Sequence, residues 1–311
     1  MPKGELNFEE GKIIDTTSGG EWVANKDRVF EFIKIEDLEK RENVCSKIFN
    51  AAPYQEENIL KFLKENSEKP LSEQWLLGKT ELIEVEKSQE ELSMIEDVIS
   101  KMDEFIKKYK GSPVHLKQEQ VHFLDSEKET KRKEAGFYAP QVQFIGIMRE
   151  KNSLSENTHR VIHEVLHFQS FQTLQISDKK GRAIPRRLGL EIISDKTGKD
   201  YFTFINEAIT EILTEKFEEA FLNSPIQIQK RKERRQNDKD KGIVMGYEGE
   251  VRIFKEILEE IYNRNQDRFL STEDVFNVFA ESYMTGELLE IARIFKKTYG
   301  KKSFRKIGEI K

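Results

Sequence analysis

The pentapeptide HEVLH at residues 163–167 constrains the fold of this chain more than any other feature of its sequence. It lies in a segment that starts as helices do, with Ser153 followed three residues later by Glu156. Residues four apart share one helix face, so His163 and His167 can direct two imidazole nitrogens at a single metal ion. Apolar residues would bury the rest of the helix: Val161, Ile162, Val165, Leu166 and Phe168. We therefore predict a buried helix that carries a metal site.

Glu164 lies one step round this helix, where its carboxylate would miss the ion but could reach a water molecule held by it. This geometry is the one that metal-assisted hydrolysis requires. The chain has only 5 histidines in 311 residues, so the pattern arises by chance in roughly one such sequence in a hundred. The alternative is a helix whose histidines and glutamate only line a polar face. His159, one turn earlier, is expected to face solvent or to support a ligand, because four-residue steps drift about 40° around a helix.

Composition argues against several classes of function. The 52 basic and 57 acidic side chains leave a net charge of -5, which provides no overall field for nucleic acid or an anionic membrane. No apolar run reaches the length of a membrane span, and the first residues lack a signal-peptide core. Cys45 is the chain's single cysteine and is expected to pack in the interior. We expect a cytoplasmic protein with neither nucleic-acid nor membrane partners.

The apolar pattern of the chain changes at residue 110, from helical spacing to short strand-like segments. Residues 1–110 are predicted to form a mainly helical region, and residues 111–311 an α+β domain. Within that domain we predict a sheet and the HEVLH helix in 111–176, a hairpin insertion in 178–204 and a helical subdomain in 205–311.

Local patterns predict the individual elements. Residues 1–20 are expected to form no element, and the charged run 229–242 a mobile surface loop, or a basic cluster that attracts an acidic partner. Apolar spacing predicts helices around 29–32, 59–63, 92–105, 248–263, 271–282 and 286–299. Short strands are predicted at 114–116, 121–124 and 141–148, and residues 82–85 are predicted to form a short strand or a linker between helices.

A second informative helix is predicted after the hairpin, in the sequence FINEAITEILTEKF. Glu207, Glu211 and Glu215 line one of its faces at four-residue spacing. A stripe of like charges costs helix stability unless a positive group lies against it, and a bound metal ion would be such a group. The alternative is a solvated acidic face near lysines.

HEVLH and NEAITE, in this order, resemble the gluzincin metallopeptidases of the thermolysin-like group. The resemblance implies a zincin-like α+β domain, with a small mixed sheet and an active-site helix flanked by helical regions. It implies that His163, His167 and Glu207 bind Zn²⁺, with a fourth position open for water, and that Glu164 is the general base.

The resemblance also assigns supporting residues. Glu211 would hydrogen-bond His163 and fix its tautomer, and Asn206 would lie near the substrate or the helix start. No histidine follows position 167, so the histidine that stabilises the oxyanion in thermolysin-like enzymes is absent. Some gluzincins use a tyrosine instead, and Tyr247 is the candidate, ahead of Tyr201 and Tyr138. The alternative for Tyr247 is a packing role.

A zinc-dependent peptidase acting on peptides or proteins is therefore expected. The aminopeptidase motif Gly-x-Met-Glu-Asn is absent, which favours an endopeptidase. The resemblance places an edge strand beside the metal, for which 141–148 is the candidate unless it is an ordinary core strand. Asp178 lacks the motif of aspartate-type zincins. The alternatives are a non-catalytic or degenerate protein of zincin fold, and a processing or toxin-like protease with one protein substrate.

Overall fold

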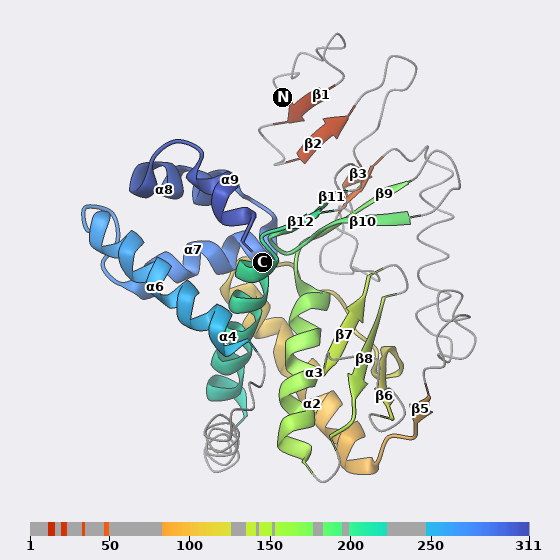
Figure 1. The fold of residues 1–311 in the computed structure, drawn as a ribbon. Coiled ribbons are helices and arrows are strands. Elements are labelled where there is room, and N and C mark those ends of the chain that lie inside the picture. The colour runs from red at the N-terminus through yellow and green to blue at the C-terminus, as the bar shows by residue number, and fades with distance from the viewer. Residues whose placement is uncertain are drawn as a thin grey trace.

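The computed structural model describes residues 83–125, 135–140, 143–150, 153–176, 183–194, 199–222 and 247–310, together with four strands between residues 12 and 49. The fold is mixed α+β, with small mixed sheets beside a set of helices (Figure 1). In the part of the chain that is described, no helix has the length and apolar character needed to span a bilayer.

The four-stranded sheet next to the HEVLH helix has the strand order β5-β6-β8-β7. These strands are β5 (Glu84–Val85), β6 (Val121–Leu124), β8 (Phe144–Met148) and β7 (Gly136–Ala139). β6 and β8 are parallel and buried along their whole length, as expected for strands covered on both faces. The strand predicted at 141–148 is therefore central. The edge strand that lies beside the HEVLH helix is β7, antiparallel to β8 (Figure 1).

Two long helices pack against each other beside this sheet. α2 (Gln89–Lys108) begins at Ser88 with a reciprocal capping box, and α3 (Leu154–Gln169) carries HEVLH. As predicted, α3 begins after Ser153, whose side chain accepts a hydrogen bond from the backbone N–H of Glu156. The domain boundary at residue 110 stays a prediction, although α2 shares one hydrophobic core with α3.

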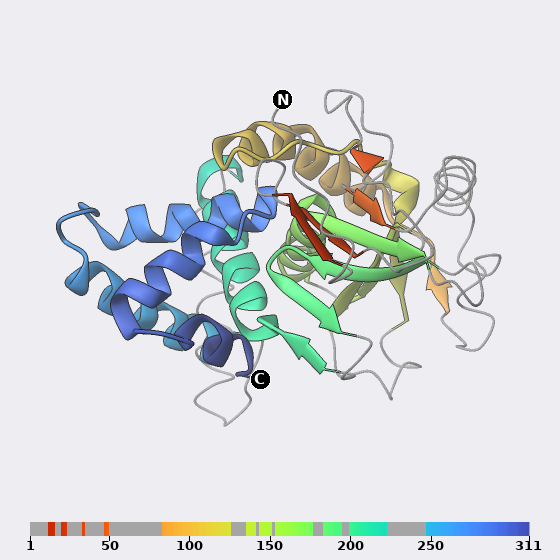
Figure 2. The same cartoon turned by 90° about the horizontal axis from the view of Figure 1, so that it is seen from above.

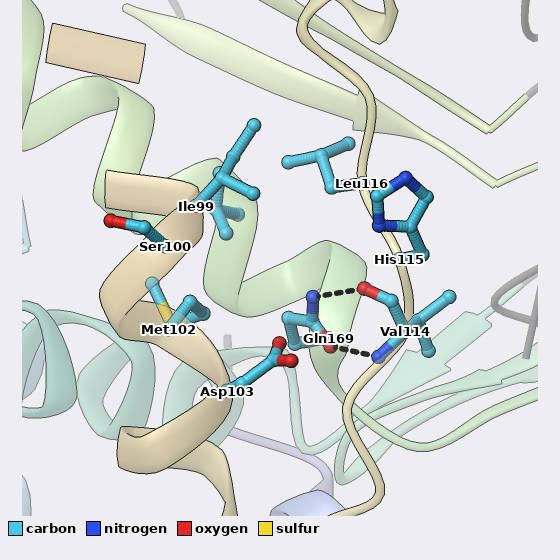
Figure 3. Close-up of a pocket in the computed structure, with 9 residues that line it drawn as sticks. Ile99, Ser100, Met102, Asp103, Val114, His115, Leu116 and Gln169 are labelled. Atoms are coloured by element: carbon cyan, nitrogen blue, oxygen red, sulfur yellow. Dashed lines mark hydrogen bonds between the residues drawn. The ribbon is translucent and has the colours of Figure 1, made fainter. Parts of the chain in front are cut away.

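The strand predicted at 114–116 is wrong. Val114 and Leu116 are buried, but the backbone N–H and C=O of Val114 bond to the side chain of Gln169 on α3, at 2.8 and 2.7 Å (Figure 3). A side chain thus satisfies both backbone groups of Val114, where a strand would have bonded to a neighbouring strand. Between this segment and α2 lies a cavity of about 230 Å³ (Figure 3).

A second sheet follows α3 directly and has the order β12-β11-β10-β9-β4-β3. Its strands are β9 (Gln172–Ile176), β10 (Ala183–Leu188), β11 (Glu191–Ser194), β12 (Lys199–Tyr201), β4 (Lys47–Phe49) and β3 (Ile33–Lys34). β10 and β11 form the hairpin predicted within 178–204. At its turn, Gly189 has φ +58, and a Cβ there would lie 2.5 Å from Asn206 and from the ring of Tyr283.

The N-terminal residues contain strands where no element was expected. β1 (Lys12–Asp15) pairs with β2 (Gly20–Val23) as an antiparallel hairpin. The β-branched pair Ile13 and Ile14 favours this extended backbone. The helices predicted around 29–32 and 59–63 lie outside the described residues, as do Cys45 and the charged run 229–242.

The remaining α-helices of the described residues form a layer on the side of α3 opposite to the four-stranded sheet (Figure 1 and Figure 2). They are α4 (Thr203–Phe221), α6 (Glu248–Arg264), α7 (Thr272–Thr285), α8 (Leu289–Tyr299) and α9 (Ser303–Gly308). α4 packs against α3 on one side and against α6 and α7 on the other. α8 starts at Leu289 rather than at Gly286, because Gly286 has φ +80 and caps α7.

Candidate metal centre

The packing of α3 against α4 brings two imidazoles and a carboxylate to one point. The Nε2 atoms of His163 and His167 lie 3.2 Å apart, and each lies 3.3 Å from Oε2 of Glu207. Both histidines are buried, and Glu207 is half-buried. Two turns of α3 and one turn of α4 therefore present three potential ligand atoms to a common centre.

These distances and this donor set fit one metal ion. In a tetrahedral zinc site with bonds of about 2.0–2.1 Å, neighbouring ligand atoms lie about 3.3–3.4 Å apart. Two imidazole nitrogens and one carboxylate oxygen form the donor set of catalytic zinc sites that keep one position open. The three residues thus match a divalent ion that prefers imidazole nitrogen and carboxylate oxygen ligands.

The second ring nitrogen of His163 also has a partner on α4. Its Nδ1 lies 3.2 Å from Oε2 of Glu211, the contact that the sequence predicted. Glu211 stands one turn after Glu207, so the same helix supplies both the carboxylate at the centre and the one behind it. An Nδ1–H that donates to Glu211 leaves the lone pair of Nε2 directed at the metal position.

The second ring nitrogen of His167 faces Tyr283 on α7, which the sequence analysis missed. The Tyr283 hydroxyl lies 3.4 Å from His167 Nδ1 and 3.0 Å from Oγ1 of Thr210. Thr210 Oγ1 already donates to the carbonyl of Asn206, so it is free to accept from the phenol. The phenol oxygen can then accept from His167. Burial raises the pKa of Tyr283 far above its ordinary value, so the group stays a neutral phenol.

Electrostatic interactions within the cluster are strong. Burial by itself would lower the pKa of His163, but the hydrogen bonds to Glu207 and Glu211 raise it to about 10. Burial would raise the pKa of Glu207, but His167 and His163 hold it well below its usual range. Glu207 is therefore ionised at neutral pH, and a metal ion must displace a proton from His163.

Glu164 lies between α3 and the edge strand β7. Its side chain is buried, and a Cβ at Gly136, the first residue of β7, would come 3.0 Å from its Oε1. Glycine at this position lets the strand approach the carboxylate closely. The Glu164 carboxylate is thus close to the first residue of the edge strand.

The other predicted residues lie at different distances from the centre. Tyr247 immediately precedes α6, and its ring stacks on His163 with centroids 5.3 Å apart and planes 9° apart. Tyr138 instead donates to Gln172 at 3.0 Å. Asn206 accepts from the backbone N–H of Leu190 at 3.0 Å, which ties the hairpin turn to the first turns of α4.

His159 is neither exposed nor directed at the centre. It is buried behind Glu211, with one ring nitrogen 3.1 Å from Oε1 of that residue. Asp178 lies outside the described residues.

Comparison with known protein families, with curated protein sequences and with solved structures found no match to this chain. The case for a function therefore depends on the residues of the centre themselves.

Proposed function

We propose that this chain is a zinc-dependent peptidase of the gluzincin type, with a zincin-like domain built on α3, α4 and the four-stranded sheet. The observation that carries the proposal is the triangle of His163, His167 and Glu207, whose ligand atoms lie 3.2–3.3 Å apart. The partners of the imidazoles add support, because each ring meets a second group at its other nitrogen, as metal-bound histidines do.

The proposed chemistry is hydrolysis with Glu164 as general base. A bound Zn²⁺ would supply Lewis-acid polarisation of the scissile carbonyl and make water easier to deprotonate. The Glu164 carboxylate accepts the proton of the attacking water and later donates it to the leaving amine. The Tyr247 phenol can donate a hydrogen bond to the developing oxyanion, and its stacking on His163 keeps it close to the centre.

The proposed substrate is an extended peptide. β7 is an edge strand in the described sheet, and a Cβ at its first residue, Gly136, would lie 3.0 Å from Oε1 of Glu164. Backbone groups on the outer side of such a strand can pair with a peptide by strand addition. A peptide bound in this way would cross the centre along its length, which agrees with cleavage inside a chain.

The test compares Glu164→Gln with the wild type on an internally quenched peptide library blocked at both ends. We expect Glu164→Gln to retain zinc and to lose about 10²–10⁴-fold in cleavage rate, as the removal of a general base does. Glu215→Gln is the matched control, because Glu215 belongs to the same charged stripe of α4 but not to the cluster. It should leave cleavage unchanged.

Cleavage that survives in Glu164→Gln would refute this mechanism. A wild type that binds zinc tightly and cleaves no peptide of the library would instead favour the two alternatives, a non-catalytic protein of zincin fold or a protease with one protein substrate.

A further inference from the structure

A third histidine of α3 lies between two carboxylates of α4. His159 Nδ1 is 3.1 Å from Oε1 of Glu218, and its Nε2 is 3.1 and 3.2 Å from the two oxygens of Glu211. All three side chains are almost fully enclosed, with residue exposures of 3% for His159, 5% for Glu211 and 1% for Glu218. Such a buried charged group persists only where each member has a partner.

The hydrogen-bonding capacity of the three groups defines their roles. An ionised carboxylate only accepts, and a neutral imidazole donates from one nitrogen alone. The structure places one ring nitrogen of His159 within hydrogen-bonding distance of each carboxylate. The imidazole therefore bridges Glu211 and Glu218 across the interface between α3 and α4.

Glu211 connects this buried group to the metal centre. Its Oε2 lies 3.2 Å from His159 Nε2 and also 3.2 Å from His163 Nδ1. The carboxylate is thus held from both sides, by a histidine at the centre and by a histidine behind it. If His159 were removed, Glu211 would lose its two contacts with that ring, at 3.1 and 3.2 Å.

We infer that His159 is a positioning residue of the metal centre. Anchored by Glu218, it holds Glu211 in the orientation that accepts from His163 Nδ1, and so keeps His163 Nε2 directed at the metal. This inference rests on the metal centre proposed above. It adds His159 and Glu218 to the centre, although neither would contact the ion.

A second buried histidine of the chain provides a matched control. His122 on β6 is 3% exposed, and its Nδ1 lies 2.6 Å from Oε1 of Glu84. Like His159 it is a buried imidazole beside a carboxylate, here the exposed Glu84, but it belongs to the four-stranded sheet and not to the cluster. His122→Gln thus reports the cost of replacing a buried histidine that contacts a glutamate, without disturbing Glu211.

The experiment measures zinc affinity by competition with a chromogenic chelator, for the wild type, His159→Gln and His122→Gln. The visible spectrum of the Co²⁺-substituted protein and the melting temperature of the metal-free protein are recorded in parallel. We expect His159→Gln to weaken zinc binding about tenfold and to alter the Co²⁺ spectrum, as loss of outer-shell support does. His122→Gln should lower the melting temperature and leave both metal readouts unchanged.

A double variant tests whether hydrogen bonding is the mechanism. In His159→Gln, the new amide donates to one carboxylate while its carbonyl oxygen faces the other. Adding Glu218→Gln supplies a donor for that carbonyl and restores the chain of hydrogen bonds to Glu211. The double variant should therefore bind zinc more tightly than His159→Gln alone.

Two results would overturn the inference while leaving the proposed function intact. One is a His159→Gln protein with reduced melting temperature but wild-type zinc affinity and Co²⁺ spectrum. The other is a double variant that binds zinc no better than His159→Gln. A wild type that binds no divalent metal would overturn the proposed function itself, and this inference with it.

Discussion

The two faces of α3 both bury polar side chains, but these side chains find their partners in different ways. On the face toward α2, the Gln169 amide pairs one donor and one acceptor with the backbone of Val114 (Figure 3). On the face toward α4, His163 and His167 meet the carboxylates of Glu207 and Glu211. The first arrangement is complete as it stands. The second gathers ionisable groups whose spacing suits a cation, which is what distinguishes a candidate site from ordinary buried polarity.

Zinc affinity should depend strongly on pH if the α4 face of α3 is the metal site. The pKa of His163 lies at about 10, so its proton is present at neutral pH and a metal ion must displace it. Below this pKa, each unit of rising pH should tighten binding up to about tenfold, or about a hundredfold from pH 6 to pH 8. Calorimetry in buffers of different ionisation enthalpy should detect about one proton released per ion.

In the metal-free protein, the same proton should make the free energy of unfolding fall as the pH rises, whereas zinc affinity increases. Because the folded pKa of His163 is raised above its ordinary value of 6.5, its contribution to the free energy of unfolding is fully present below about pH 6.5. It is lost as the pH rises through about 10.

Zinc affinity that is flat between pH 6 and pH 8 would show that His163 is not a ligand.

Tyr283→Phe should have a smaller effect on metal binding at the face of α3 toward α4. The substitution removes the hydroxyl near His167 Nδ1 and leaves the ring packed in the core. Loss of a group that orients a metal-bound histidine typically weakens the metal about tenfold, the lower end of the known range. Chelator competition measures this change. Tyr138→Phe is the control, because that hydroxyl bonds to Gln172 instead. An equal loss in the two variants would contradict a specific role for Tyr283.

Gln169→Ala should have the smallest effect on metal binding and act only on stability. It leaves the backbone N–H and C=O of Val114 without the side chain that bonds them, at a cost of about 1–3 kcal/mol for each buried group left unpaired. Denaturant titration should show a lower free energy of unfolding. Zinc affinity of the folded protein should match the wild type, and a parallel loss of zinc would mean that the two faces of α3 are not independent.

Periodicity and caps explain what could be read from the sequence. Ser153 begins its helix where its capping pattern predicted, and Ser271 caps the helix that apolar spacing predicted at 271–282. Four-residue spacing placed His163 with His167, and Glu207 with Glu211, on one face of their helices whatever the rest of the fold does. Only the resemblance to gluzincins joined the two faces into one site, and α3 does pack against α4.

The parts that could not be predicted depend on tertiary pairing. Nothing in the apolar pattern of α7 separates Tyr283 from its neighbours, because its contact with His167 arises only when α7 packs on α4. The sequence likewise could not tell that β7, and not the strand containing residues 144–148, lies at the sheet edge. The segment 114–116 has the residues of a strand, but its hydrogen bonds go to Gln169. Each outcome was decided by a partner distant in sequence.

Zinc content per chain tests the central claim most directly. It would be measured by elemental mass spectrometry on protein purified without added metal. The wild type would be compared with Glu207→Ala and with the control Glu215→Gln. The proposed centre predicts about one zinc per chain in the wild type and in Glu215→Gln, and little in Glu207→Ala, which lacks one of three ligands. No zinc in any of the proteins, even after reconstitution, would mean that HEVLH is only a buried helix face.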